Sequence, residues 1–340
     1  MKISTLGSHC ALQLLKSAKD EGFHTLLLSD RKRKGFYGRF KFIDEIIVVD
    51  KFEDIAREEI QDKFKDSILI PHGTLIAQVP LDKVERDLKI PIFGNKYLLR
   101  WEADRTLKEK LLLEAKLKVP KRFSSPDEID SLVIVKLPGA EGGRGYFLAY
   151  NKESFERNLK NLIKRGIIKK EEEDKLYIQE YVLGTPVFLH YFYSPLKDEL
   201  ELISIDRRYE TIVDSIGRIP ATYQKNLDYP SYLVIGNFPL VLRESLLPEV
   251  YSMGEEFVKA SKRLVGKGAI GPFCLEGVYN EKGEFICFEF SGRIVAGTNL
   301  FIDGSPYTWL NYDEPMSMGK RIAREIRRAI ELKELDKILT

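Results

Sequence analysis

Short apolar runs alternate with amphipathic segments over the first 97 residues. The runs are four or five residues long: KISTL (2–6), TLLLS (25–29), EIIVV (45–49), SILI (67–70) and PIFG (91–94). CALQLLKSAKDEG (10–22) and the charged stretch 52–65 lie between them and carry apolar residues at helical spacing. Short apolar strands separated by helices are typical of a parallel α/β sheet. We therefore predict a Rossmann-like N-terminal α/β domain over residues 1–97.

The rest of the chain mixes helical patterns with strands. Between 98 and 195 the pattern predicts a long helix from Leu98 to about Lys116, strands at 132–136, 146–150 and 175–184, and a charged helix over 152–165. Beyond 195 it predicts a strand at 199–210, helices near 246–264 and 318–334, and a β-hairpin between these helices. We predict two α+β units here, 98–195 and 196–340.

Two loops of the N-terminal domain carry polar groups directly after a strand. They are Gly7-Ser8-His9 and Pro71-His72-Gly73-Thr74. Ligands of parallel sheets bind at the carboxyl ends of strands, and the N–H groups of a helix that begins there can hold an anion. These loops are therefore predicted to form part of a binding site.

A glycine-rich loop follows a lysine at the end of the strand LVIVK (132–136). Lys136 precedes the four glycines of this loop, Gly139, Gly142, Gly143 and Gly145. In the P-loop motif the lysine follows the glycines, so this is a different design. We predict a mobile phosphate cover next to a phosphate-binding lysine.

The hairpin GPFCLEGVYNEKGEFICFEFSGR (271–293) carries two glutamates in its strands. If NEKG forms the turn and Tyr279 faces Glu284, Glu276 lies opposite Cys287 and is a diagonal neighbour of Glu289. Diagonal neighbours have Cα atoms roughly 7–8 Å apart, which suits Mg²⁺ held by two carboxylates and substrate phosphates. The same register places Cys274 and Cys287 on that face, which leaves a zinc site as an alternative. Surface glutamates above buried cysteines are the other alternative.

Composition restricts the class of partner. Lys+Arg 54 against Asp+Glu 52 gives a net charge of +2, which is too balanced to favour nucleic acid or an anionic membrane. No run approaches the roughly 18 apolar residues of a membrane span. The N-terminus lacks the apolar core of a signal peptide, and three cysteines make no disulfide framework. We expect a cytoplasmic protein.

The order of these features is specific: a lysine, a glycine loop, the strand IQEYV and two late carboxylates. It resembles the ATP-grasp superfamily, in which ATP lies between two α+β lobes. The resemblance implies that Lys136 contacts the α- and β-phosphates and that the loop, with Arg144, covers the β- and γ-phosphates. It also implies that residues 179–182 (Gln179, Glu180, Tyr181, Val182) read the adenine and that Glu210 accepts from the ribose. Glu276 and Glu289 would hold Mg²⁺ or Mn²⁺, and Arg293 would stabilise an acyl phosphate. Ser291 stands where many members have Asn.

A narrower resemblance covers nearly the whole chain. It rests on GSHCALQLLKSAKDEGF, PHGTLIA, FGNKYLLRWE, VKLPGAEGGRGYF, DRRYE, GNFPLVLRESLLP, GPFCLEG and RIVAGTN. Together they resemble the PurP family, archaeal enzymes that join formate to the 5-amino group of AICAR (5-aminoimidazole-4-carboxamide ribonucleotide) with ATP, giving FAICAR through formyl phosphate. The resemblance implies that AICAR contacts His9, Thr74 and Asn237. Thr74 and Cys10 depart from the common Ser at the first position and Ser or Thr at the second.

Two alternatives remain open for the function. One is an ATP-grasp ligase for another small carboxylic acid, and the other is a non-catalytic paralogue that binds AMP or AICAR as a sensor. We expect ATP, formate and AICAR as small-molecule partners, no nucleic acid, no membrane, and assembly into a homo-oligomer.

Overall fold

The computed structural model describes residues 1–137, 146–211, 218–224 and 233–340. Its strands are β1 (Lys2–Leu6), β2 (His24–Asp30), β3 (Glu45–Val49), β4 (Ser67–Leu69), β5 (Arg122–Phe123), β6 (Val133–Lys136), β7 (Tyr146–Ala149), β8 (Tyr177–Glu180), β9 (Thr185–Ser194), β10 (Glu199–Glu210), β11 (Val234–Pro239), β12 (Gly271–Tyr279) and β13 (Phe285–Ser291). Its α-helices are α1 (Ala11–Asp20), α2 (Lys34–Tyr37), α3 (Glu58–Gln61), α4 (Gly73–Gln78), α5 (Leu81–Arg86), α6 (Lys96–Ala103), α7 (Arg105–Glu114), α8 (Lys152–Lys164), α10 (Ala221–Gln224), α11 (Leu247–Leu264), α12 (Met318–Leu332) and α13 (Leu335–Ile338).

The N-terminal sheet is parallel, as the sequence predicts. Its strand order is β3-β2-β1-β4, and every pairing within it is parallel. Side chains from its two faces enter separate apolar cores, so that Ile3 packs with Leu14 of α1 while Leu6 packs with Leu75 of α4. Because β1 and β4 are neighbours, the loops that follow them meet at the same edge of the sheet.

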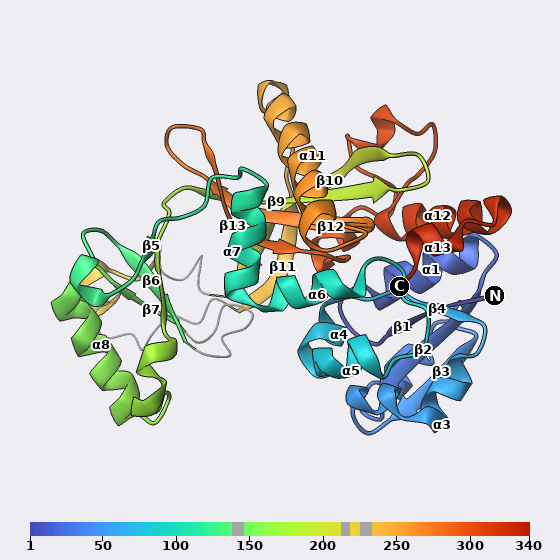
Figure 1. Cartoon of the computed structure of the whole chain (residues 1–340), viewed down its shortest axis with the longest axis horizontal. Coiled ribbons are helices and arrows are strands. Elements are labelled where there is room, and N and C mark those ends of the chain that lie inside the picture. Colours follow the sequence, from blue (N-terminus) through green and yellow to red (C-terminus); the bar gives the residue numbers. More distant parts are fainter. Residues whose placement is uncertain (138–145, 212–217, 225–232) are drawn as a thin grey trace.

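The C-terminal helices return to this first unit, beside the N-terminus in Figure 1. Ile322 and Ile326 of α12 share a core with Leu14 of α1. The two helices approach closely at Gly319, where an added Cβ would lie 2.8 Å from Ser17 Oγ. Thr340 then pairs with Ile92 through two backbone hydrogen bonds of 2.9 Å. The end of the chain thus completes the edge of the first sheet.

Two antiparallel sheets form the rest of the molecule. The small sheet, β5-β8-β6-β7, is covered by α8 and forms the lobe at the left of Figure 1. The large sheet, β11-β10-β9-β12-β13, packs against α7 and α11 around a core that includes Tyr191, Phe257 and Phe273. The parallel domain followed by two α+β lobes is the fold class that the sequence predicts. The domain boundaries 1–97, 98–195 and 196–340 remain our proposal. These boundaries assign β9 to the second unit, although β9 pairs with β10 and β12 of the large sheet.

The long helix predicted from Leu98 to about Lys116 is two helices. Asp104 takes an extended conformation between α6 and α7, and its carboxylate accepts from the amides of Thr106 and Leu107, both at 2.9 Å. An aspartate N-cap satisfies amides that otherwise lack partners and starts a new helix. The break points α6 toward the first unit and α7 along the large sheet.

Two other local predictions are wrong in detail. The helical pattern at 52–65 forms only α3 flanked by short 3₁₀ helices. The run PIFG makes isolated bridges, Ile92 with Leu69 and Phe93 with Leu339, instead of a strand. Both segments lie at the margin of the first sheet, where tertiary contacts override local propensity.

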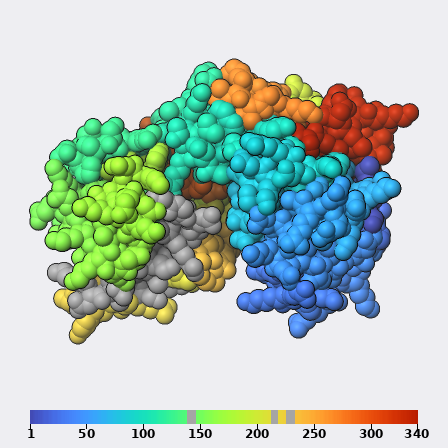
Figure 2. Space-filling model, turned by 60° about the horizontal axis from the view of Figure 1, so that its bottom comes forward, coloured from blue at the N-terminus to red at the C-terminus, as the bar shows by residue number. Residues whose placement is uncertain are grey.

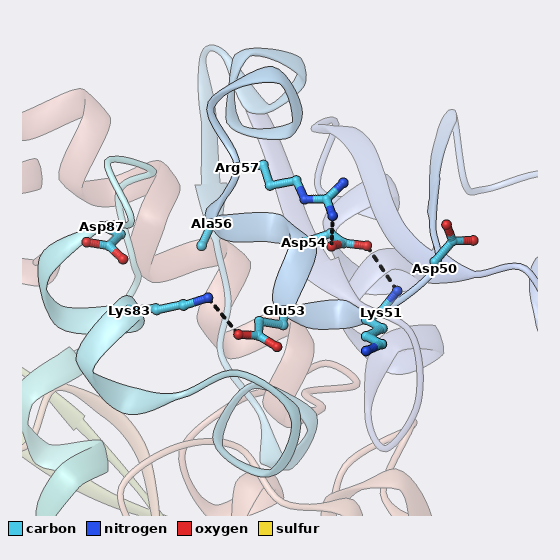
Figure 3. A pocket seen from close by; sticks show the side chains of 8 residues that line it. All are labelled: Asp50, Lys51, Glu53, Asp54, Ala56, Arg57, Lys83 and Asp87. Atoms are coloured by element: carbon cyan, nitrogen blue, oxygen red, sulfur yellow. Dashed lines mark hydrogen bonds and ion pairs between the residues drawn. The ribbon is translucent and has the colours of Figure 1, made fainter.

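A surface depression of about 510 Å³ lies on the N-terminal unit (Figure 3). Its charged walls pair with each other: Lys83 lies 2.6 Å from Glu53, and Arg57 lies 3.1 Å from Asp54. None of the residues that the sequence predicts to bind ligands lines it, so it is not a candidate site. Across the described part of the chain, no helix combines the length and the apolar character needed to cross a membrane.

Candidate active site

The two polar loops of the first sheet meet where parallel strands end. His9 follows β1 and Thr74 lies in the first turn of α4 after β4, and His9 Nδ1 lies 3.0 Å from Thr74 Oγ1. Gly73 permits this approach, because a Cβ there would lie 2.9 Å from His9 Nε2. Desolvation lowers the pKa of His9, and the charges of Arg293 and Arg33 lower it further. The loops therefore present a neutral imidazole beside a hydroxyl.

The backbone around His9 is strained and held from both sides. Ser8 and His9 have φ values of 107° and 45°. The Ser8 amide donates to the hydroxyl of Tyr37 at 2.5 Å, and the Asn299 side chain donates to the His9 carbonyl at 3.0 Å. Non-glycine residues keep such conformations only where the surrounding structure imposes them, as at ligand sites.

His72 is a structural residue of the second loop. Its Nε2 donates to the carbonyl of Leu6 at 2.8 Å, and its Nδ1 accepts from the Thr74 amide at 3.2 Å. Burial lowers the pKa of His72 to about 3, so the ring is neutral near pH 7. It joins the two loops and starts α4.

Glu276 and Glu289 lie directly opposite each other, which corrects the predicted diagonal arrangement. The Asn280 amide donates to the Glu284 carbonyl at 3.0 Å, and Gly283 has a φ of 75°. The loop between the strands is therefore one residue longer than the predicted turn NEKG. Tyr279 therefore faces Phe285, and a bulge between Cys287 and Glu289 shifts the register once more. Directly opposed side chains share one face of the sheet and lie closer together than diagonal ones.

The bulge also separates the two cysteines. Cys287 lies in the core under α7 and α11, whereas Cys274 packs with Phe188 and Val295 on the other face. The zinc alternative is therefore wrong. Within residues 1–137, 146–211, 218–224 and 233–340, no three His, Cys, Asp or Glu side chains are grouped to hold a metal ion.

Three cations act on Glu289: Lys108, Lys136 and Arg208. Lys108 of α7 pairs with the Glu289 carboxylate at 2.5 Å. Lys136 at the end of β6 also interacts electrostatically with this carboxylate. Burial would raise the pKa of Glu289, but Lys108 and Lys136 lower it well below its usual range. Burial lowers the pKa of Lys136, and Lys108 and Arg105 act in the same direction. The cluster has an excess of positive charge, which suits phosphate groups.

Glu276 has its own cation and its own orienting hydroxyl. Its side chain is 3% exposed, and Arg208 of β10 pairs with it at 2.6 Å. Ser291 donates to the other carboxylate oxygen at 2.8 Å. The serine that replaces the common asparagine thus orients Glu276. Arg208 also stacks over Phe188, with 4.2 Å between its guanidinium carbon and the ring centroid.

Arg293 is held by Glu102 of α6. Its Nη2 lies 2.7 Å from the Glu102 carboxylate, whose other oxygen accepts from the Gly292 amide at 2.9 Å. Burial raises the pKa of Glu102, and Arg293 opposes that effect. Arg293 also interacts electrostatically with His9 and with Glu276. It therefore lies between the loops of the first unit and the carboxylate pair.

The segment 293–299 connects the predicted substrate residues. Ile294 bridges to His72, Asn299 holds the His9 carbonyl, and Gly297 lies against Asp206 of β10. Asp206 in turn accepts from the Asn237 side chain at 2.6 Å. His9, Thr74 and Asn237 are therefore parts of one wall.

The residues predicted to read adenine lie at the end of β8 and in the link to β9, and Glu210, predicted to contact the ribose, is the last residue of β10. The amides of Glu180 and Tyr181 are bonded to Lys121 and Leu132, while Val182 makes no backbone hydrogen bond with any part of the chain that the structure describes. Gln179 is buried in β8. Burial raises the pKa of Glu210, whose charge acts on Tyr181. The predictions for the glycine-rich loop concern residues that lie outside the described part of the chain: Gly139, Gly142, Gly143, Arg144 and Gly145.

Figure 2 shows the surface hollowed between the N-terminal unit and the small lobe, with α6 and α7 above the hollow. The polar side chains from Lys136 to Thr74 belong to the elements around this hollow, and we refer to them as the polar wall. Lys108 and Glu102 belong to that wall and were not predicted. In the sequence, Glu102 and Lys108 are spaced like charged residues on the solvated face of a helix. The interruption of the helix at Asp104 directs Glu102 to Arg293 and Lys108 to Glu289.

The donor set fits a hard divalent cation. Two opposed carboxylates of one hairpin supply oxygen ligands, and Mg²⁺ usually takes one or two carboxylates together with substrate phosphates. Arg208 and Lys108 pair with these carboxylates in the structure.

The chain is similar to known proteins over its whole length. Two family models match, "Protein of unknown function (DUF1246)" over residues 3–123 and "Domain of unknown function (DUF1297)" over 154–340. A 5-formaminoimidazole-4-carboxamide-1-(beta)-D-ribofuranosyl 5'-monophosphate synthetase of Nitrosopumilus maritimus is 55% identical, with 99% of each chain covered. The protein of that name from Methanocaldococcus jannaschii is 51% identical, with 99% of this chain and 94% of the relative covered.

A solved structure agrees with these relatives. The crystal structure of an IMP biosynthesis protein PurP from Thermococcus kodakaraensis has a TM-score of 0.79 and 32% identity, and covers 99% of this chain and 100% of that one. With relatives of this identity over nearly its full length, the chain belongs to the 5-formaminoimidazole-4-carboxamide ribonucleotide synthetase (PurP) family and has the ATP-grasp fold.

Proposed function

We propose that this chain is an ATP- and formate-dependent ligase that converts AICAR to FAICAR, with release of ADP and phosphate. The relatives are named for the 5-formamino product. One observation carries the proposal: a continuous polar wall runs from Lys136 and Glu289, through Glu276 and Arg293, to His9 and Thr74. Such a wall can hold a triphosphate at one end and an amine-bearing nucleotide at the other.

In the first step a formate oxygen attacks the γ-phosphorus of ATP, and the bond to ADP breaks. Lys136 and Lys108 would hold the phosphate oxygens, and Arg293 would hold the carboxylate that accepts the phosphoryl group. Mg²⁺ or Mn²⁺ held by Glu276 and Glu289 would neutralise the charge that develops on the phosphates. The product is formyl phosphate.

In the second step the 5-amino nitrogen attacks the formyl carbon, the carbon–oxygen bond to phosphate breaks and the amine loses a proton. His9, Thr74 and Asn237 are assigned to the nucleotide that carries this amine. The neutral His9 beside Thr74 can donate or accept a hydrogen bond. Formyl phosphate must be kept from water, which the hollow between the N-terminal unit and the small lobe would favour.

The test is product formation with purified protein, MgATP, formate and AICAR, with each component omitted in turn. FAICAR and ADP that form only in the complete mixture establish the reaction. Replacement of formate by acetate tests the ligase for another small acid. AICAR or AMP binding without turnover in calorimetry would instead identify a non-catalytic paralogue.

A further inference from the structure

A buried ionisable pair next to Asn237 has no part in the mechanism above. Asp206 on β10 and His190 on β9 are each 1% exposed. His190 Nε2 contacts one oxygen of the Asp206 carboxylate at 2.5 Å, and Asn237 Nδ2 contacts the other at 2.6 Å. A buried carboxylate is costly, so its retention beside a predicted substrate residue calls for an explanation.

The carboxylate fixes which way the Asn237 amide points. An ionised carboxylate only accepts hydrogen bonds, so the Asn237 atom that contacts it must be the NH₂ group. The amide carbonyl then points away from Asp206. His190 acts on the carboxylate in the same way, because only an Nε2–H can donate to it.

Asp206 is also packed closely by the segment that contains Gly297. Gly297 lies against the carboxylate, and a Cβ there would lie 2.2 Å from Oδ1. His190 Nδ1 has no hydrogen-bond partner among the described residues, and a proton on it would be a buried donor without an acceptor. This favours the tautomer with its proton on Nε2, directed at Asp206.

We propose that Asp206, held by His190, is a positioning residue that keeps the Asn237 carbonyl oxygen facing the acceptor nucleotide. The site then offers a fixed hydrogen-bond acceptor and selects a ligand that presents an N–H there, which AICAR does through its amino and carboxamide groups. This inference rests on the proposed function, because it takes the acceptor to be an aminated nucleotide.

The decisive variant is Asp206→Asn, which keeps the shape and removes the charge. An amide at 206 has one oxygen and cannot accept from both His190 and Asn237, so the orientation of Asn237 is lost. We expect kcat/KM for AICAR to fall roughly ten- to a hundredfold, with KM for ATP and for formate unchanged. Ser204→Ala is the matched control, because Ser204 is a buried residue of the same strand whose hydroxyl has no hydrogen-bond partner in the part of the chain that the structure describes. It should leave all three KM values unchanged.

The reciprocal variant Asp206→Asn with Asn237→Asp separates positioning from a structural role. It restores a carboxylate–amide hydrogen bond and again presents only acceptors at position 237, so AICAR affinity should recover in part. An unchanged AICAR KM in the single variant overturns the proposal. So does a rise in the ATP KM, a fall in melting temperature that the control does not show, or an absence of recovery in the reciprocal variant.

Failure of the proposed function is a separate outcome. If the wild-type protein makes no formylated product, calorimetric binding of AICAR to the wild type and to Asp206→Asn still tests the positioning role. Equal affinities would overturn it, and a tenfold or larger loss in the variant would support it.

Discussion

Glu276 and Glu289 face each other directly across β12 and β13, and each is paired with a cation from outside the hairpin. Arg208 comes from β10 of the same sheet, whereas Lys108 comes from α7. Each cation offsets the charge of the carboxylate that it contacts, so two acidic side chains can lie directly opposite each other on one face of the hairpin.

Glu289→Gln should abolish turnover and metal dependence while the fold remains intact. The variant loses an oxygen ligand and leaves Lys108 without its ion-pair partner. We expect kcat to fall by roughly 10²- to 10³-fold, as for the loss of a group that stabilises transition-state charge. The measurement is ADP release across a Mg²⁺ or Mn²⁺ titration. Glu281→Gln, on the exposed hairpin turn, is the control, and wild-type rates in Glu289→Gln would remove this residue from the site.

Lys136→Ala should weaken ATP binding and turnover together. Burial lowers the pKa of Lys136, and Lys108 and Arg105 outnumber Glu289 around it, so a bound phosphate would supply the missing counter-charge. We expect an increase in KM for ATP and a loss of kcat of roughly 10²-fold or more. Lys152→Ala changes an exposed lysine of the same lobe and should have little effect. Normal ATP saturation in Lys136→Ala would contradict the assignment.

Glu102→Gln should affect Arg293 without touching the nucleotide sites. The carboxylate holds both the Arg293 guanidinium and the Gly292 amide, and an amide cannot accept from both. We expect kcat to fall roughly ten- to a hundredfold, with a smaller change in KM for AICAR. Steady-state kinetics against Glu114→Gln, an exposed glutamate of α7 paired with Arg263, provides the comparison. Equal kcat values would show that Arg293 needs no support from Glu102.

Thr74→Val should raise KM for AICAR and spare ATP. The substitution keeps the shape of the side chain and removes the hydroxyl that contacts His9. Loss of one buried hydrogen bond corresponds to about 1–3 kcal/mol, or roughly five- to a hundredfold in affinity. Calorimetry with AICAR and with ATP measures both effects, and Thr74→Ser should retain wild-type affinity. An unchanged AICAR affinity in Thr74→Val would exclude Thr74 from the pocket.

Stability should decrease on acidification because of His72. Its pKa is lowered from 6.5 to about 3 by burial, so between these values the unfolded chain binds a proton that the native chain does not. The free energy of unfolding therefore decreases as the pH is lowered through this window, by up to about 1.4 kcal/mol per pH unit. His72→Asn keeps a cap for α4 and should remove this contribution. Urea unfolding at several pH values, with His24→Asn as the surface control, measures it. Parallel pH profiles for wild type and His72→Asn would contradict the prediction.

The sequence by itself determined the class of fold and the order of the chemistry. Period-two and period-3.6 patterns carry the alternation of strands and helices, so the parallel first sheet and the two later lobes follow from local propensity and burial. A lysine at the end of a strand before a glycine loop, and polar loops after β1 and β4, predict site residues because strand ends meet at one edge of a sheet.

Tertiary structure decided the register and the partners. A hairpin register depends on the conformation of Gly283 and on a bulge near Phe288, neither of which the alternation of apolar residues specifies. Asp104 divides one helical pattern into two helices, and that break alone brings Glu102 and Lys108 into the site. Asp206 and His190 look like ordinary strand residues until the sheet places them beside Asn237. Each depends on contacts between residues far apart in the chain, which local pattern does not encode.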